Sequence, residues 1–117
     1  MEMTLAYLRE TVDVIAGNGF TSNETVETVT NGAGAPLYDR HAFELRRSAN
    51  EDLVLECLIY PDGTETYWLE LRRMHRLKTF PFQIDSWKHH ADRIEFRYYA
   101  RDDGVALTIE MAFADPT

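Results

Sequence analysis

The chain opens with apolar residues at the spacing of an α-helix. They recur at every third or fourth position, which places them on one face of a helix that can pack on a core. The positions in this stripe are Leu5, Leu8, Val12 and Ile15. Thr4 is a suitable N-cap, and the glycine-containing residues 17–19 supply the backbone freedom that ends a helix. The pattern predicts one helix over residues 4–16.

The remainder of the chain alternates apolar and polar residues with the period of β-strands. We expect residues 20–24 to form a loop and residues 25–30, rich in Thr and Val, to form an edge strand. Residues 31–36 are small and glycine-rich, which is typical of a flexible connector. Further strands are expected at residues 41–47, 53–60, 65–74, 80–84, 93–101 and 105–113.

Turn residues and prolines place these strands relative to one another. Residues 61–64 and 102–104 contain Asp-Gly pairs typical of tight turns, so the strands on either side should pair antiparallel. Residues 53–60 are apolar on both faces, which is typical of a central strand. Pro81 places its strand at an edge or a bulge. Residues 85–91 fit either a strand or one helical turn, and we favour the strand because another strand follows at once.

These elements predict an α+β fold in which one N-terminal helix packs on a curved antiparallel sheet of five to seven strands in meander order. A chain of 117 residues is expected to form a single domain, 1–117. Its 44% hydrophobic and 12% aromatic content is typical of a folded protein. It has no run of about 18 apolar residues and no basic segment before an apolar one, so we expect a cytoplasmic protein without membrane contact.

The net charge of −8 is unevenly distributed along the chain. Residues 1–66 carry 12 carboxylates against four arginines, and residues 102–117 carry four carboxylates and no Lys or Arg. Residues 67–101 carry eight Lys and Arg against four carboxylates. A basic strip interleaved with aromatic residues therefore crosses an acidic chain, and the charge boundary is the expected binding face.

Residues with catalytic or metal-binding chemistry form no recognisable pattern. Zinc needs three or four convergent ligands, whereas the adjacent His89 and His90 would point to opposite faces of a strand. His75 lies between two arginines, which would repel a cation. Cys57 lies in an apolar stretch and is expected to be a buried, inert thiol. We therefore expect no catalytic residue, no metal site and no cofactor.

The candidate binding residues combine aromatic and charged side chains of the strip with the acidic turn that follows it. They are Trp68, Arg72, Arg73, Arg76, Trp87, Arg97, Tyr99, Asp102 and Asp103. Trp, Tyr and Arg dominate the binding energy of protein interfaces. The same arginines would also suit a solvated sheet face, where they pair with cross-strand carboxylates, or phosphate contacts with nucleic acid. The acidic total makes nucleic acid an unfavoured partner.

An acidic domain without a catalytic pattern is better explained as a binding module than as an enzyme. We expect it to occlude another protein, such as a basic nuclease or effector, as bacterial or phage inhibitors, immunity proteins and anti-defence proteins do. A homodimer is a further option. The alternative is a small-molecule-binding or catalytic domain with a pocket between the helix and the curved sheet. That pocket would be lined by Trp68, His75, Trp87, His89 and Tyr98.

Overall fold

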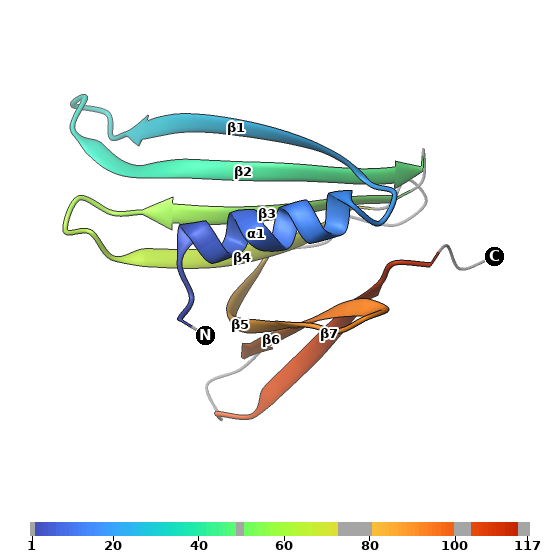
Figure 1. Cartoon of the computed structure of the whole chain (residues 1–117). Coiled ribbons are helices and arrows are strands. Elements are labelled where there is room, and N and C mark those ends of the chain that lie inside the picture. Colours follow the sequence, from blue (N-terminus) through green and yellow to red (C-terminus); the bar gives the residue numbers. More distant parts are fainter. Residues whose placement is uncertain (1, 49–50, 73–80, 100–103, 115–117) are drawn as a thin grey trace.

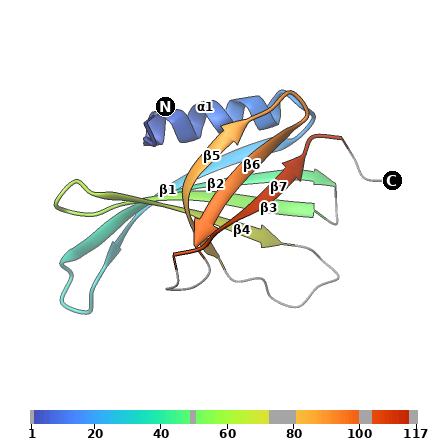
Figure 2. The same ribbon diagram turned by 90° about the horizontal axis from the view of Figure 1, so that it is seen from below.

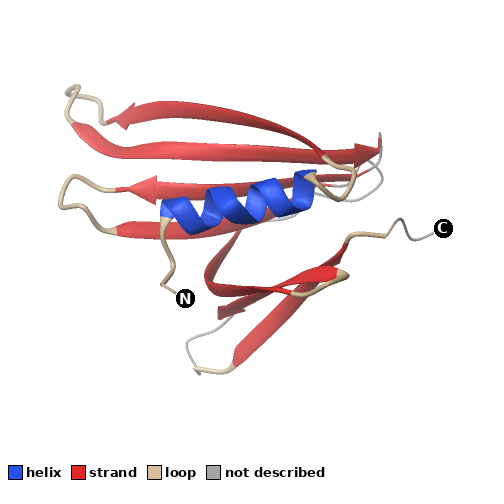
Figure 3. Ribbon diagram, viewed as in Figure 1, coloured by secondary structure: helices blue, strands red, loops and turns tan. Residues whose placement is uncertain are grey.

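The computed structural model of the chain describes residues 2–48, 51–72, 81–99 and 104–114. Within them, one N-terminal helix is followed by seven antiparallel strands, which lie in the sheet in chain order (Figures 1 and 3). The predicted α+β meander is therefore confirmed. No helix among these residues is long and apolar enough to cross a membrane.

Helix α1 (Leu5–Ala16) begins where the sequence predicts. Thr4 has an extended backbone, and its Oγ1 accepts a hydrogen bond from the backbone N–H of Tyr7 at 3.0 Å, as an N-cap does. The helix is followed by Gly17, and Gly19 has a φ of 97°, which favours glycine. The residues that α1 buries are Tyr7, Leu8, Thr11, Val12 and Ile15. Most of the predicted apolar stripe therefore faces the core, with one threonine in it.

The strands differ in extent from those expected. They are β1 (Thr21–Thr30), β2 (Pro36–Ser48), β3 (Glu51–Ile59), β4 (Glu65–Arg72), β5 (Phe82–His89), β6 (Arg93–Tyr99) and β7 (Ala106–Ala112). β1 starts inside the segment 20–24, so the loop expected there is wrong. β2 starts at Pro36, which leaves residues 31–35 as the connector, because a proline is tolerated at the first position of a strand. Backbone pairing along both strands stabilises this hairpin, although every residue of β1 except Val29 is exposed.

Residues 85–91 lie mostly in a strand, as predicted. β5 runs to His89 and pairs with β4 on one side and with β6 on the other. Of the edge or bulge expected from Pro81, the edge position is therefore wrong, whereas the strand does contain a bulge, at Asp85. The proline directly precedes the strand, where its missing N–H removes no ladder hydrogen bond. In contrast, β1 is an edge strand and β3 lies inside the sheet, as predicted.

The pairing of β5 with β6 shifts between Ile84 and Ser86, which places a bulge at Asp85. Side chains of a strand alternate between the two faces of a sheet. One extra residue therefore moves every side chain after it to the face opposite the one that unbroken alternation would give. Trp87 therefore points to the same face as Ile84, and both side chains are 2% exposed.

The sheet bends between β4 and β5. Among the described residues, the ladder that joins these strands covers residues 67–69 against 82–84, and β5, β6 and β7 turn out of the plane of β1–β4 (Figures 1 and 2). The core lies between α1 and the side of the sheet that faces it. Its most buried side chains include Leu8, Ile15, Leu45, Leu55, Leu69, Trp87 and Phe96. Burial of each such side chain contributes about 1.5–3 kcal/mol relative to exposure.

Candidate functional site

The predicted binding residues fall into three groups. Those outside the described residues are Arg73, Arg76, Asp102 and Asp103, and of Arg72 only the backbone is described. Strand register places Trp68, Arg97 and Tyr99 on the side of the sheet that faces away from α1. Trp87 lies on the opposite side, in the core. The structure therefore leaves Trp68, Arg97 and Tyr99 on one exposed side of the sheet.

Trp87 is a core residue and not a surface anchor. Its ring stacks on that of Tyr7 with 5.2 Å between centroids, and it meets the ring of Tyr67 at 5.3 Å in an edge-on arrangement. The bulge at Asp85 turns the indole toward α1, which alternation along an unbroken strand would not do. Trp87 thus holds α1 against β5 and is not available to a partner.

We refer to the side of β1–β4 that faces away from α1 as the open face. Its side chains alternate along β3 with Leu55 and Cys57, which point into the core. The charged side chains described on the open face are Glu27, Glu44, Glu56, Glu70, Arg40 and Arg46. Among these described side chains, four are carboxylates and two are guanidinium groups.

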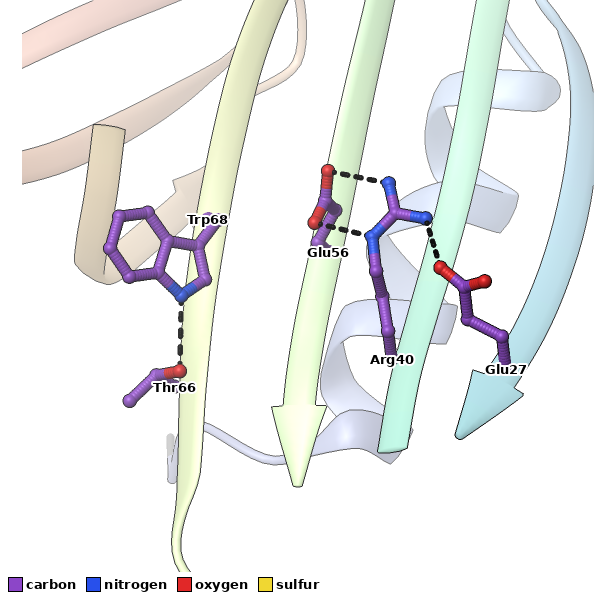
Figure 4. Close-up of polar contacts among 5 residues, drawn as sticks. All are labelled: Glu27, Arg40, Glu56, Thr66 and Trp68. Carbon is purple, nitrogen blue, oxygen red and sulfur yellow. Dashed lines mark hydrogen bonds and ion pairs between the residues drawn. The ribbon is translucent and has the colours of Figure 1, made fainter. Parts of the chain in front are cut away.

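Arg40 of β2 is the centre of an ion-pair network on the open face (Figure 4). Its guanidinium donates two hydrogen bonds to Glu56, from Nε at 2.9 Å and from Nη2 at 3.0 Å. A third goes from Nη1 to Glu27 at 3.1 Å. The Glu56 side chain is 13% exposed, so this bidentate pair is partly shielded from water. The hydrogen bond with Glu56 raises the pKa of Arg40, and burial opposes this effect.

Trp68 of β4 stands opposite Glu56 on the open face. Its indole Nε1 donates a hydrogen bond to Oγ1 of Thr66 at 3.0 Å, which orients the ring (Figure 4). The side chain is half-buried, so part of the ring is open to solvent. An oriented aromatic ring on a sheet face that also carries carboxylates offers an apolar contact to a cationic partner.

Arg97 of β6 is neutralised by a carboxylate. It donates two hydrogen bonds to Asp85, from Nε at 3.1 Å and from Nη2 at 2.9 Å, and these raise the pKa of the guanidinium. Arg93 of the same strand lies 3.2 Å from Glu110 of β7. These two arginines therefore have the cross-strand partners of a solvated sheet face. Tyr99 is 48% exposed.

A second candidate site is a hollow of about 440 Å³ between the start of α1 and β5. Its lining includes Tyr7, Glu10, Trp87, Lys88 and His89. The Tyr7 ring also stacks on that of His89, with 5.1 Å between centroids. Burial and, to a smaller extent, the Glu10 carboxylate raise the pKa of Tyr7, so its hydroxyl keeps its proton at neutral pH. The volume falls within the range of small-molecule pockets, about 300–1,000 Å³.

Thr11 of α1 sets the position of a proton on His89. Its Oγ1 donates its single proton to the carbonyl oxygen of Tyr7 at 2.9 Å and accepts a hydrogen bond from Nε1 of Trp87 at 2.7 Å. The 2.7 Å contact between this oxygen and Nε2 of His89 therefore requires a proton on Nε2. With a proton on Nε2, Nδ1 is the ring nitrogen that can accept a hydrogen bond from a ligand.

The hollow matches the expected pocket in part. Trp87 and His89 line it as expected, whereas Trp68 lies on the open face. Tyr98 packs against the core and beside Phe82, with 5.0 Å between ring centroids, and His75 lies outside the described residues. No group of three or more His, Cys, Asp or Glu side chains in the described part of the chain is placed to hold a metal ion.

Sequence reasoning missed the side chains that organise both sites. Thr11 has a signal, because it is a polar residue inside the apolar stripe of a helix. Glu56 has one too, because it is the single charge within the apolar residues 53–60 and needs a cationic partner. Arg40 has none, since it precedes the strand expected at residues 41–47.

The chain is an α+β protein in which α1 covers one sheet face, while the described side chains of the other face include more carboxylates than guanidinium groups. The chain matches no protein-family profile, no curated protein and no solved structure. The open face and the hollow lie on opposite sides of the sheet, so separate substitutions can test them.

Proposed function

We propose that the chain is a small acidic protein-binding module that occludes the working surface of a basic protein, in the manner of an inhibitor, immunity or anti-defence protein. The observation that carries the proposal is the position of Trp68, opposite Glu56 on a sheet face that α1 does not cover. Tryptophan is among the residues that most often dominate interface energy. The excess of carboxylates around it would steer a cationic partner and speed association.

Two carboxylates of the open face are held in place before a partner arrives. Arg40 bridges Glu27 and Glu56, so a single guanidinium orients two carboxylates and leaves one negative charge in excess. Side chains that are already ordered lose less conformational entropy when an interface forms. This arrangement supports the open face as a contact surface for a cationic partner.

The proposal is tested by capturing a partner from the native host and then measuring its binding in purified form. We expect a basic protein that the chain inhibits and that binds more weakly as salt increases. Trp68→Ala should weaken binding at least about 30-fold, equivalent to about 2 kcal/mol. Glu10→Gln removes a carboxylate on the helix side and is the matched control, with affinity unchanged.

Two outcomes would contradict the open face as the contact surface. One is a partner that binds Trp68→Ala as tightly as the wild-type chain. The other is an affinity that does not change with salt. Circular dichroism and thermal melting of Trp68→Ala establish that the variant keeps its fold, since the ring is half-buried.

A second candidate function is small-molecule binding in the hollow, and the proton placed on Nε2 of His89 favours it. A fragment collection can be screened by NMR, with the indole N–H of Trp87 as reporter because it donates to Thr11 beside the hollow. The indole N–H of Trp68 is the internal control on the other side of the sheet. Shifts at Trp87 without shifts at Trp68 support this function, and fragments that leave Trp87 unshifted argue against it.

A further inference from the structure

β7 is the last strand of the sheet, and one of its two edges has no strand partner among the described residues. The strand contains one charged residue, Glu110. Leu107 is 43% exposed, and Tyr99 on the neighbouring β6 is 48% exposed. An exposed edge strand with apolar side chains and little charge is a template for pairing with another strand.

The outward backbone groups of β7 follow from its pairing with β6. The N–H of Phe113 donates to the carbonyl oxygen of Asp92 at 2.9 Å, and the register continues without a shift to the start of β7. Hydrogen-bonded positions alternate along an antiparallel pair, so Leu107, Ile109 and Met111 bond to β6. Ala106, Thr108, Glu110 and Ala112 therefore turn their N–H and C=O groups toward the other edge, where the carbonyl oxygen of Ala112 accepts a hydrogen bond from Arg47 at 3.3 Å.

We propose that β7 pairs antiparallel with β7 of a second copy of this chain, around a two-fold axis that passes through Ile109. Two directly opposed residues of an antiparallel pair point to the same face of the sheet. In two copies of one strand, the opposed residues must therefore both be odd-numbered or both be even-numbered. This is possible only if the two-fold axis passes through a residue and not between two residues. An axis at Glu110 would set two carboxylates against each other. An axis at Ile109 places Thr108 opposite Glu110 of the second copy and uses the outward groups of both residues.

This register also joins apolar surface. Leu107 comes to lie opposite Met111 of the second copy, on the side of the sheet that carries Ile109. Ile109 and Met111 already pack against the core, so the apolar surface of each copy would continue into the other. The pairing is self-complementary and closed, because the same strand is used by both copies.

The other edge of the sheet is a poorer surface for a second copy. β1 carries Glu24 and Glu27, which pair with Arg9 and Arg40 within the same chain. Two β1 strands would bring four carboxylates together, and a β1–β7 contact would leave free edges that extend into a filament. The pairing through β7 sets no carboxylate of the strand opposite another, because Glu110 is the one charged residue of β7 and lies opposite Thr108 of the second copy.

The test is the molar mass of the chain, measured by light scattering and sedimentation over a concentration series. We expect a monomer–dimer equilibrium that salt strengthens, because both copies are acidic. Thr108→Glu should weaken the dimer at least about tenfold, because the new glutamate would lie opposite Glu110 of the second copy and the two-fold axis creates this like-charge pair twice. Thr108→Lys should not weaken it, because the lysine faces Glu110 of the second copy. Val26→Lys on β1, at a side chain that is 56% exposed, is the control and should leave the mass unchanged.

The proposal is overturned if the wild-type chain stays monomeric at every concentration, if Thr108→Glu and Thr108→Lys dimerise equally, or if Val26→Lys dissociates the dimer. It is independent of the function proposed for the open face. Trp68→Ala should leave the dimer intact, and Thr108→Glu should leave the open face intact, so failure of one proposal is distinguishable from failure of the other.

Discussion

The guanidinium of Arg47 donates a hydrogen bond to the carbonyl oxygen of Phe113 at 2.8 Å. Arg47 belongs to β2, whereas Phe113 follows β7, so the contact joins parts of the sheet that are far apart in strand order. The same guanidinium lies 4.9 Å from the centroid of the Phe20 ring. A side chain of β2 therefore links to the end of β7, and among the described residues no strand pairing joins these two strands.

Replacement of Arg47 should loosen the end of β7. In Arg47→Met we expect faster hydrogen exchange at the amide of Phe113 and a free energy of unfolding lower by about 1.5–3 kcal/mol, the range for hydrogen bonds to charged groups. Arg47→Lys keeps the charge but not the planar fork and should give a smaller effect. Exchange at Phe113 that is unchanged in Arg47→Met would show that the contact does not hold the strand.

The hydroxyl of Thr11 should be needed for stability. Thr11→Val keeps the shape but leaves the buried Nε1 of Trp87 without an acceptor, which should lower the free energy of unfolding by about 1–3 kcal/mol. Thr11→Ser retains the hydroxyl and is the matched control, with a smaller loss. Urea denaturation measures both, and equal stability of Thr11→Val and the wild-type chain would argue against this role.

Cys57 should be unreactive in the folded chain. Its side chain is fully buried, and burial, with a smaller contribution from Glu65, raises the pKa of its thiol to about 12. Since the thiolate is the reactive form, a disulfide reagent at about pH 8 should label Cys57 only after denaturation. The variant Val26→Cys adds an exposed thiol and should gain one rapid equivalent. Rapid labelling of the native wild-type chain would contradict the burial.

The turn after β3 should make stability depend on pH in the acid range. Hydrogen bonds from the side chain and the backbone N–H of Thr64 lower the pKa of Asp62. A carboxyl whose pKa is lower in the folded chain than in the unfolded chain stabilises the fold at pH values above its unfolded pKa of about 3.9. This stabilisation is lost as the pH falls through the pKa of the folded chain. Thr64→Val should therefore be less stable than the wild-type chain at neutral pH, and the difference should shrink in acid. Urea denaturation across this range, with NMR titration of the Asp62 carboxyl, checks it; a constant difference would count against the linkage.

The sites were less predictable than the elements that carry them. Trp68 and Trp87 look alike in the sequence, since each lies in a short alternating segment rich in aromatic and polar residues. One is half-buried on the open face and the other is in the core, because the bulge at Asp85 exchanges the faces of β5. Pro81 indicates an edge or a bulge in this strand, but a bulge depends on how two strands pair, so no local pattern in residues 80–91 specifies its position at Asp85.

By itself the sequence determined the helix at Leu5–Ala16, the chain order of the strands and the antiparallel meander, because each rests on short-range periodicity, capping and turn chemistry. Tertiary structure decided which side chains work together. Arg40 meets Glu56 and Glu27 across three strands, and Thr11 meets Trp87 and His89 across the core. Those contacts join residues far apart in the chain, so they exist only once strand register and the bend of the sheet have brought the residues together.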